Sequence, residues 1–161
     1  SIFMVFMITS FAHAEYECET KTIQTKDSEI VRTTFCGEAQ GFTLEAINPS
    51  NDFILKYNGK PVLKLVNSEY FSVNLKRVFT IKGDKVVLLE LNSGGSLCPA
   101  LYTFVTVKPD GTAKKTEDFG TCSDLIEVYR QGDTIIVKMP KLTGRSKKTY
   151  IYKDGNLIKG K

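Results

Sequence analysis

The sequence has no tryptophan and only one histidine, His13, which lies in an apolar leader at the start of the chain. Beyond that leader, a Ser-His-Asp or Cys-His nucleophile and a histidine-bound metal are therefore excluded. The glycine patterns of P-loops and of dinucleotide-binding folds are also absent. The common hydrolytic, metal-dependent and nucleotide-dependent enzymes thus lack their residue patterns here. We expect a protein with no catalytic role, no metal and no cofactor.

Two catalytic arrangements need no histidine. Glu117 and Asp118 could form a carboxylate pair, as in glycosidases. Neighbours on a strand point to opposite faces, however, so solvated strand residues are the better interpretation. Ser93 or Ser96, beside two adjacent glycines, could pair with a lysine, but no S-x-x-K motif is present. A tight backbone turn explains the glycines more simply.

Residues 1–14 are mostly apolar and end in Ala12-His13-Ala14, a small-x-small pattern typical of signal-peptide cleavage. The apolar run is too short to span a bilayer. It has neither an initiator methionine nor a basic start, so we expect a signal peptide truncated at its start; a buried strand is the alternative. Residues 15–161 have the size of one β domain with one core. We therefore expect a periplasmic or secreted protein without a transmembrane segment.

Four cysteines in an exported chain predict two disulfides, with three possible pairings. We favour Cys18–Cys36 and Cys98–Cys122, because each would staple one predicted hairpin. The first hairpin turns at Asp27, which sets Cys18 opposite Cys36. A four-cysteine zinc site is the alternative, but the sequence has no C-x-x-C pair.

The second bridge follows from the clearest hairpin signal in the chain. Pro109 presets φ for a turn, Asp110 suits the next position, and Gly111 can take a positive φ where the strand restarts. A turn centred on Asp110 pairs the residues on either side of it. If no bulge intervenes, the same register sets Cys98 opposite Cys122.

Alternating apolar residues and turn signals predict hairpin after hairpin, with Asn58-Gly59 as the strongest short turn. Gly83-Asp84 and Asp154-Gly155 mark further turns. The strands we expect are 16–24, 29–35, 42–47, 53–57, 61–66, 78–81, 85–91, 101–107, 112–119, 125–130, 134–139, 150–153 and 156–158. The segment 68–77 is the best helix candidate, although a strand or loop suits it equally.

The resulting fold class is all-β, an antiparallel meander stapled by disulfides. The segments 85–91 and 101–107 carry valine and leucine on both faces, so we expect them to be central strands. So many strands in one open sheet would be unusually wide. We favour a sandwich over a closed, lipocalin-like barrel.

Charge is distributed unevenly along the chain. Residues 138–161 hold eight basic residues against the single acid Asp154, a net charge of +7, so that the remainder carries −3 of the total of +4. Such asymmetry indicates an anionic partner or only a solvated basic tail. An acidic protein face, a lipid headgroup and a cell-wall polymer all fit. Nucleic acid does not, because the chain is exported and Tyr150 and Tyr152 suit a core better than a stacking platform.

The pattern G-G-x-x-C-P-x-x-Y…F-G-x-C-S-D, which runs from Gly94 to Asp124, resembles a segment of small exported bacterial proteins of unassigned function. The resemblance covers about thirty residues and carries no activity. It implies a periplasmic or secreted setting and supports the Cys98–Cys122 pairing.

We therefore expect a non-catalytic exported binding protein, of the inhibitor or immunity type, that docks a protein partner with an acidic face. Stapled loops suit this role because they lose little ordering entropy on binding. A lipocalin-like carrier of a small apolar molecule is the alternative. The sequence leaves the partner and the oligomeric state open. The candidate binding residues are Ser93, Gly94, Gly95, Ser96, Lys141, Arg145, Lys147 and Lys148.

Overall fold

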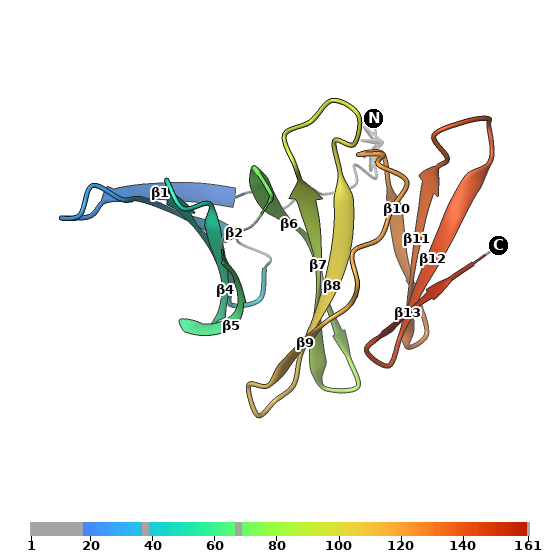
Figure 1. Ribbon diagram of the computed structural model, residues 1–161. Coiled ribbons are helices and arrows are strands. Elements are labelled where there is room, and N and C mark those ends of the chain that lie inside the picture. Colours follow the sequence, from blue (N-terminus) through green and yellow to red (C-terminus); the bar gives the residue numbers. More distant parts are fainter. Residues whose placement is uncertain (1–17, 37–38, 67–68, 161) are drawn as a thin grey trace, which may run out of the picture.

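The computed structural model describes residues 18–36, 39–66 and 69–160 and shows an all-β protein built from antiparallel hairpins (Figure 1). The expected fold class is confirmed. The strands described lie in three open sheets rather than in a closed barrel. The predicted leader, residues 1–14, lies outside the described residues.

Consecutive strands are neighbours in every sheet, so each sheet is a simple meander. Sheet A contains β1 (Cys18–Gln24), β2 (Ile30–Cys36), β3 (Phe42–Asn48), β4 (Asp52–Tyr57) and β5 (Lys60–Leu65). Sheet B contains β6 (Ser72–Ile81), β7 (Asp84–Asn92), β8 (Leu101–Val107) and β9 (Ala113–Lys115). Sheet C contains β10 (Glu127–Gln131), β11 (Thr134–Pro140), β12 (Lys147–Lys153) and β13 (Asn156–Lys159).

Sheet B is the middle layer, with sheet A on one face and sheet C on the other (Figure 1). Residues of β7 alternate between the two faces. Val87 and Leu89 belong to the core shared with sheet A, whereas Val86 and Leu88 belong to the core shared with sheet C. This explains the apolar residues on both faces of β7 and β8, and it confirms that these two strands are central.

Most turns occur where their residues predict them, with one correction. Asn58 and Gly59 have φ values of 48° and 81°, as a two-residue hairpin turn requires. The β6–β7 turn, however, consists of Lys82 and Gly83, with φ values of 50° and 84°, instead of Gly83-Asp84. Asp84 pairs with Ile81 and begins β7. Placing Gly83 second lets it take the larger positive φ, while lysine tolerates the first position.

The helix candidate 68–77 is irregular over 69–71 and a strand from Ser72, where β6 begins. Val73 and Val78 on this strand are buried in the core shared with sheet A. An amphipathic helix would have buried apolar residues on one side only. As a strand, the segment pairs with β7 and extends the middle sheet. Tertiary packing therefore decides between the alternatives that the sequence left open.

The predicted return strand 112–119 is shorter, since β9 ends at Lys115. The predicted register holds at the start, where Val105 pairs with Lys115. Farther along, Tyr102 pairs with Phe119 in an isolated bridge, so the register has slipped by one residue. Three residues that follow Lys115 absorb this slip.

The Cys98–Cys122 disulfide forms despite the slip, with 4.5 Å between the Cα atoms. The sequence assumed a hairpin without a bulge, and the positive φ of Cys122, 67°, marks the irregular backbone that reaches the bridge instead. The Cα atoms of Cys18 and Cys36 are register partners on β1 and β2. Their side chains lie outside the described residues, so that bridge stays a prediction.

Candidate functional site at the loop end

The two ends of the stacked sheets B and C differ in construction (Figure 1). At one end, here called the turn end, two- and three-residue turns join the strands. Nζ of Lys82, in the β6–β7 turn, lies 3.8 Å from Oδ2 of Asp133 and 3.4 Å from Oδ1 of Asp154. Because these aspartates belong to the β10–β11 and β12–β13 turns, the two ion pairs link three turns. At the opposite end, the loop end, the connections 93–100, 116–126 and 141–146 are longer. Long loops on a rigid sheet are the usual place for binding residues.

A chain of contacts joins the loops of the loop end. The hydroxyl of Ser93 donates a hydrogen bond to the Cys98 carbonyl at 3.3 Å, and Cys98 is bonded to Cys122. The neighbouring hydroxyl of Thr121 donates to the carbonyl of Pro140, the last residue of β11. These contacts link the two candidate segments, 93–96 and 141–148, indirectly, and both segments lie at the loop end.

Gly94 fixes the shape of the first loop. Its φ is +79°, and its N–H donates to Oδ1 of Asn92 at 2.7 Å. A Cβ atom at this position would lie 3.2 Å from Cβ of Phe71. Glycine is therefore needed both for the backbone conformation and for the close approach of Phe71. Gly95 has room for a side chain, because a Cβ atom there would lie 3.7 Å from its nearest neighbour, the hydroxyl of Ser93.

Large apolar side chains project into solvent at the loop end. Leu97 is 92% exposed, Phe71 73%, Leu142 73% and Leu125 69%. Each belongs to a different connection of that end. Fully burying one leucine or phenylalanine side chain stabilises a complex by about 1.5–3 kcal/mol. Exposed apolar groups gathered at one end are the usual sign of an interaction surface.

The predicted basic residues divide into two pairs. Lys141 and Arg145 are exposed in the 141–146 loop, and within the described part of the chain no ion pair involves either of them. Lys147 and Lys148 belong to β12 and not to the 141–146 loop. Nζ of Lys147 lies 2.5 Å from Oε1 of Glu127, and Lys148 donates to the Gly160 carbonyl at 2.8 Å. The first pair is therefore the one available to a partner.

Tyr102 holds the loop after the disulfide in place. Its ring is fully buried, and its hydroxyl donates to the Ser123 carbonyl at 2.9 Å. Burial, and then the negative charge of Glu90, raise the pKa of this tyrosine well above its usual range. The hydroxyl thus stays protonated and positions the backbone that leads to Leu125.

No family model, curated protein or solved structure matches the chain. The case for the loop end therefore rests on its own geometry. The G-G-x-x-C-P-x-x-Y…F-G-x-C-S-D segment has a structural account here: Gly94 makes the turn, the cysteines make the bridge, and the rings of Tyr102 and Phe119 pack with centroids 6.1 Å apart. Its resemblance to exported bacterial proteins stays a prediction.

Sequence reasoning missed Phe71, Leu125 and Leu142 as candidate binding residues. Leu142 offered a signal, since it is an isolated apolar residue among the polar and basic residues of 141–148. Phe71 and Leu125 offered none, because each adjoins a segment that could equally have been a buried strand. Only the stacking of sheets B and C places these side chains at one end.

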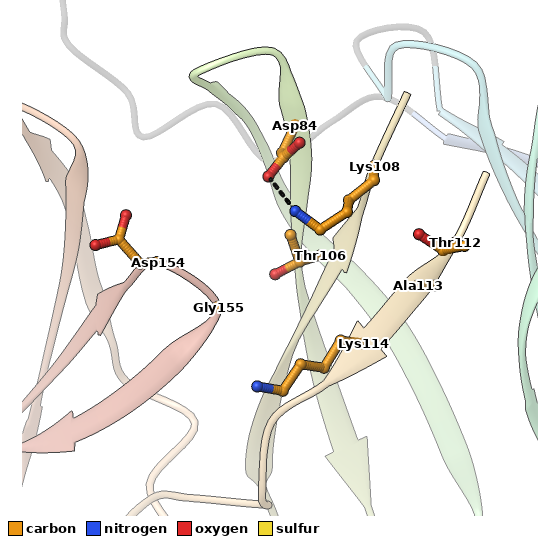
Figure 2. A pocket seen from close by; sticks show the side chains of 8 residues that line it. All are labelled: Asp84, Thr106, Lys108, Thr112, Ala113, Lys114, Asp154 and Gly155. Atoms are coloured by element: carbon orange, nitrogen blue, oxygen red, sulfur yellow. Dashed lines mark ion pairs between the residues drawn. The ribbon is translucent and has the colours of Figure 1, made fainter. Parts of the chain in front are cut away.

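A pocket of about 340 Å³ lies at the opposite, turn end, between β8, β9 and the β12–β13 turn (Figure 2). Charged side chains line it: Lys108 lies 3.5 Å from Asp84, and Lys114 donates to Oδ1 of Asn156 at 3.4 Å. Asp154 faces them from the other sheet. Such a lining suits water or a small polar solute, and it does not suit the apolar cargo of a carrier.

Asp118 and the potential metal-ligating side chains bear on whether the described ranges could support catalysis or metal binding. No cluster of three or more metal-ligating side chains is found there. Asp118, once a candidate acid, accepts a hydrogen bond from Tyr70 and lies 2.6 Å from Nζ of Lys115. Residues 18–36, 39–66 and 69–160 also contain no helix long and apolar enough to cross a membrane. The Cys98–Cys122 disulfide is compatible with an exported protein.

Proposed function

We propose that this protein is a non-catalytic, exported binding protein, of the inhibitor or immunity type, that docks a protein partner through its loop end. One observation carries the proposal: four large apolar side chains project from separate connections of the loop end. The Cys98–Cys122 bridge, the contacts of Ser93 and Thr121, and the hydrogen bond from the Phe71 N–H to the Asn92 carbonyl hold these connections in place. Such loops lose little entropy on binding, so the burial of their side chains contributes more fully to affinity.

Leu97 is the expected anchor. It is the most exposed of the four side chains and stands directly beside Cys98. Binding energy usually concentrates in a few side chains that fill pockets of the partner, with less important contacts around them. We therefore expect Leu97 to enter an apolar pocket, with Leu125 and Leu142 contributing around it.

Lys141 and Arg145 give the partner its expected charge. Both cations are exposed beside Leu142. Exposed charges at the rim of an interface mainly accelerate association and make it depend on salt. A partner with carboxylates around an apolar pocket would match this arrangement. The acidic face that the basic segment led us to expect on the partner would then be a ring of carboxylates that contacts the 141–146 loop.

A capture experiment tests the proposal. Residues 15–161, which contain every strand described, would be immobilised, and proteins retained from extracts of the producing and neighbouring cells would be identified by mass spectrometry. Capture alone is insufficient. A genuine partner should be lost with Leu97→Ser and with Leu125→Ser, but retained with Ile23→Ser, which removes an equally apolar, 60% exposed side chain from sheet A. Equal retention by all variants would eliminate the loop end as the docking surface.

A further inference from the structure

Sheet C has a second face that sheet B does not cover. Ile135, Val137 and Met139 on β11, and Tyr150 and Tyr152 on β12, are buried against sheet B. Because successive side chains of a strand point to opposite faces, the residues between them point away from sheet B. In Figure 1 no described strand packs on that side of sheet C. We call it the outer face.

An apolar row crosses the outer face from edge to edge. The registers of the four strands align one apolar residue from each. The row, in order across the sheet, is Tyr129, Ile136, Ile151 and Ile158. The two at the edges, Tyr129 and Ile158, are 40% and 49% exposed, and the two central isoleucines are partly exposed. An ordinary solvated face would carry polar residues at these positions.

Basic residues flank this row on both sides. Lys138 lies in the neighbouring row, with its Nζ 5.8 Å from the centre of the Tyr129 ring. Lys153 lies in the row on the other side, opposite Thr134. The acid Glu127 is already matched by Lys147 at 2.5 Å. The outer face is therefore apolar along its centre and cationic at its flanks, and three lysines of the basic C-terminal segment, Lys138, Lys147 and Lys153, lie on it.

The charge argues against a second copy on this face. Two outer faces packed together would bring Lys138, Lys147 and Lys153 of both copies into one interface, with only Glu127 from each to offset them. Lysine is depleted in protein–protein interfaces, which disfavours a protein partner on a sheet face flanked by lysines. A lipid surface needs only an apolar strip at the acyl boundary and cations at the headgroups.

We infer that the outer face of sheet C docks on an anionic lipid surface. The isoleucine row would reach the acyl boundary, Tyr129 would sit at the headgroup level, where aromatic residues are favoured, and the flanking lysines would contact lipid phosphates. Because the strands then lie along the membrane, the loop end points sideways and stays accessible. This inference is independent of the proposed protein partner and uses different residues.

The absence of tryptophan gives a clean test. Tyr129→Trp in residues 15–161 would be titrated with vesicles of phosphatidylcholine and phosphatidylglycerol, and with phosphatidylcholine vesicles as the uncharged comparison. We expect a blue shift of emission with the anionic vesicles only. Phe71→Trp at the loop end and Ile23→Trp on sheet A should show no shift. A shift at Phe71→Trp and none at Tyr129→Trp would overturn the assignment.

Vesicle cosedimentation supplies the second measurement. Lys138→Glu combined with Lys153→Glu should weaken binding by about tenfold or more, since each basic residue near an anionic surface contributes substantially. Lys60→Glu combined with Lys64→Glu, two exposed lysines of β5 on sheet A, makes the same change in net charge and should bind as the unaltered protein does. Failure of the unaltered protein to bind anionic vesicles, equal loss in the control, or a lipid-free dimer that Ile158→Ser dissolves would each contradict the inference.

Discussion

Single glycines and tyrosines set the geometry of the loop end. Gly94 and Gly95 look equivalent in the sequence, yet only Gly94 has a positive φ and lies against Phe71. The sequence could predict a turn at this pair, but it could not tell which glycine the turn depends on. That distinction comes from Phe71, a distant residue whose packing no local pattern reveals.

The two glycines therefore form a matched pair of substitutions. Gly94→Ala should destabilise the fold by about 1–2 kcal/mol, because alanine is strained at positive φ and its Cβ would press on Phe71. Gly95→Ala should change stability by no more than about 0.5 kcal/mol, as at an ordinary exposed site. Urea unfolding followed by circular dichroism measures both values. Equal effects of the two substitutions would refute the assigned role of Gly94.

Buried tyrosines should make the fold sensitive to alkali. Burial chiefly raises the pKa of Tyr102, and burial together with its hydrogen bond to Asp118 raises that of Tyr70. A tyrosine in the unfolded chain has a pKa of about 10. Above that pH the unfolded state binds fewer protons than the folded state, so stability falls as pH rises, by up to about 1.4 kcal/mol per pH unit for Tyr102.

Tyr102→Phe removes the contribution of Tyr102 to this sensitivity, together with the hydrogen bonds of its hydroxyl to Ser123 and Glu90. At neutral pH the variant should be less stable by about 1 kcal/mol, through the loss of the bond to Ser123. Its stability should also fall less steeply than that of the unaltered protein between pH 9 and 11, a range of roughly one unit on either side of the pKa of tyrosine in the unfolded chain. Parallel pH profiles would show that Tyr102 does not remain protonated in the fold.

At the scale of the element, the strands of the middle sheet show what a sequence can and cannot predict. Apolar residues on both faces of 85–91 correctly indicated a strand covered on two sides. They could not indicate which sheets cover it, because a side chain shows only that its face is buried. The slip between Lys115 and Phe119 was equally unpredictable, since it depends on the pairing of Tyr102 with Phe119.

Neighbouring leucines on β7 test the three-layer arrangement. Leu88 faces the core shared with sheet C and Leu89 the core shared with sheet A. Leu88→Ala and Leu89→Ala should each cost about 2–5 kcal/mol of stability, because each leaves a cavity in a separate core. Ile158→Ala on the outer face should cost far less. A small effect at either leucine, measured by denaturant unfolding, would mean that one face of sheet B is uncovered.

At the scale of the whole molecule, one disulfide joins two of the loops at the loop end, 93–100 and 116–126. Cys98–Cys122 closes a segment with a sequence separation of 24 residues, and on loop-closure grounds it should contribute on the order of 3 kcal/mol. Cys98→Ser combined with Cys122→Ser should lower the free energy of unfolding by about that amount. Unchanged stability would show that the hairpin pairing and Tyr102 hold these loops without the bridge.

The position of the two candidate segments at the same end is also a property of the whole molecule. The sequence identified 93–96 and 141–148 separately, and nothing local relates them. Their position at the same end follows from the stacking of sheet C on sheet B with both sets of tight turns at the opposite end. Such packing depends on residues spread over eight strands, so it becomes visible only in the folded structure.

The most direct test of the docking account is the affinity of the captured partner for Leu97→Ser, measured by calorimetry beside Ile23→Ser. We predict at least a tenfold weaker Kd for Leu97→Ser, roughly the effect of losing one buried anchor, and no change for Ile23→Ser. A Kd for Leu97→Ser equal to that of the unaltered protein would contradict the claim that the loop end binds the partner.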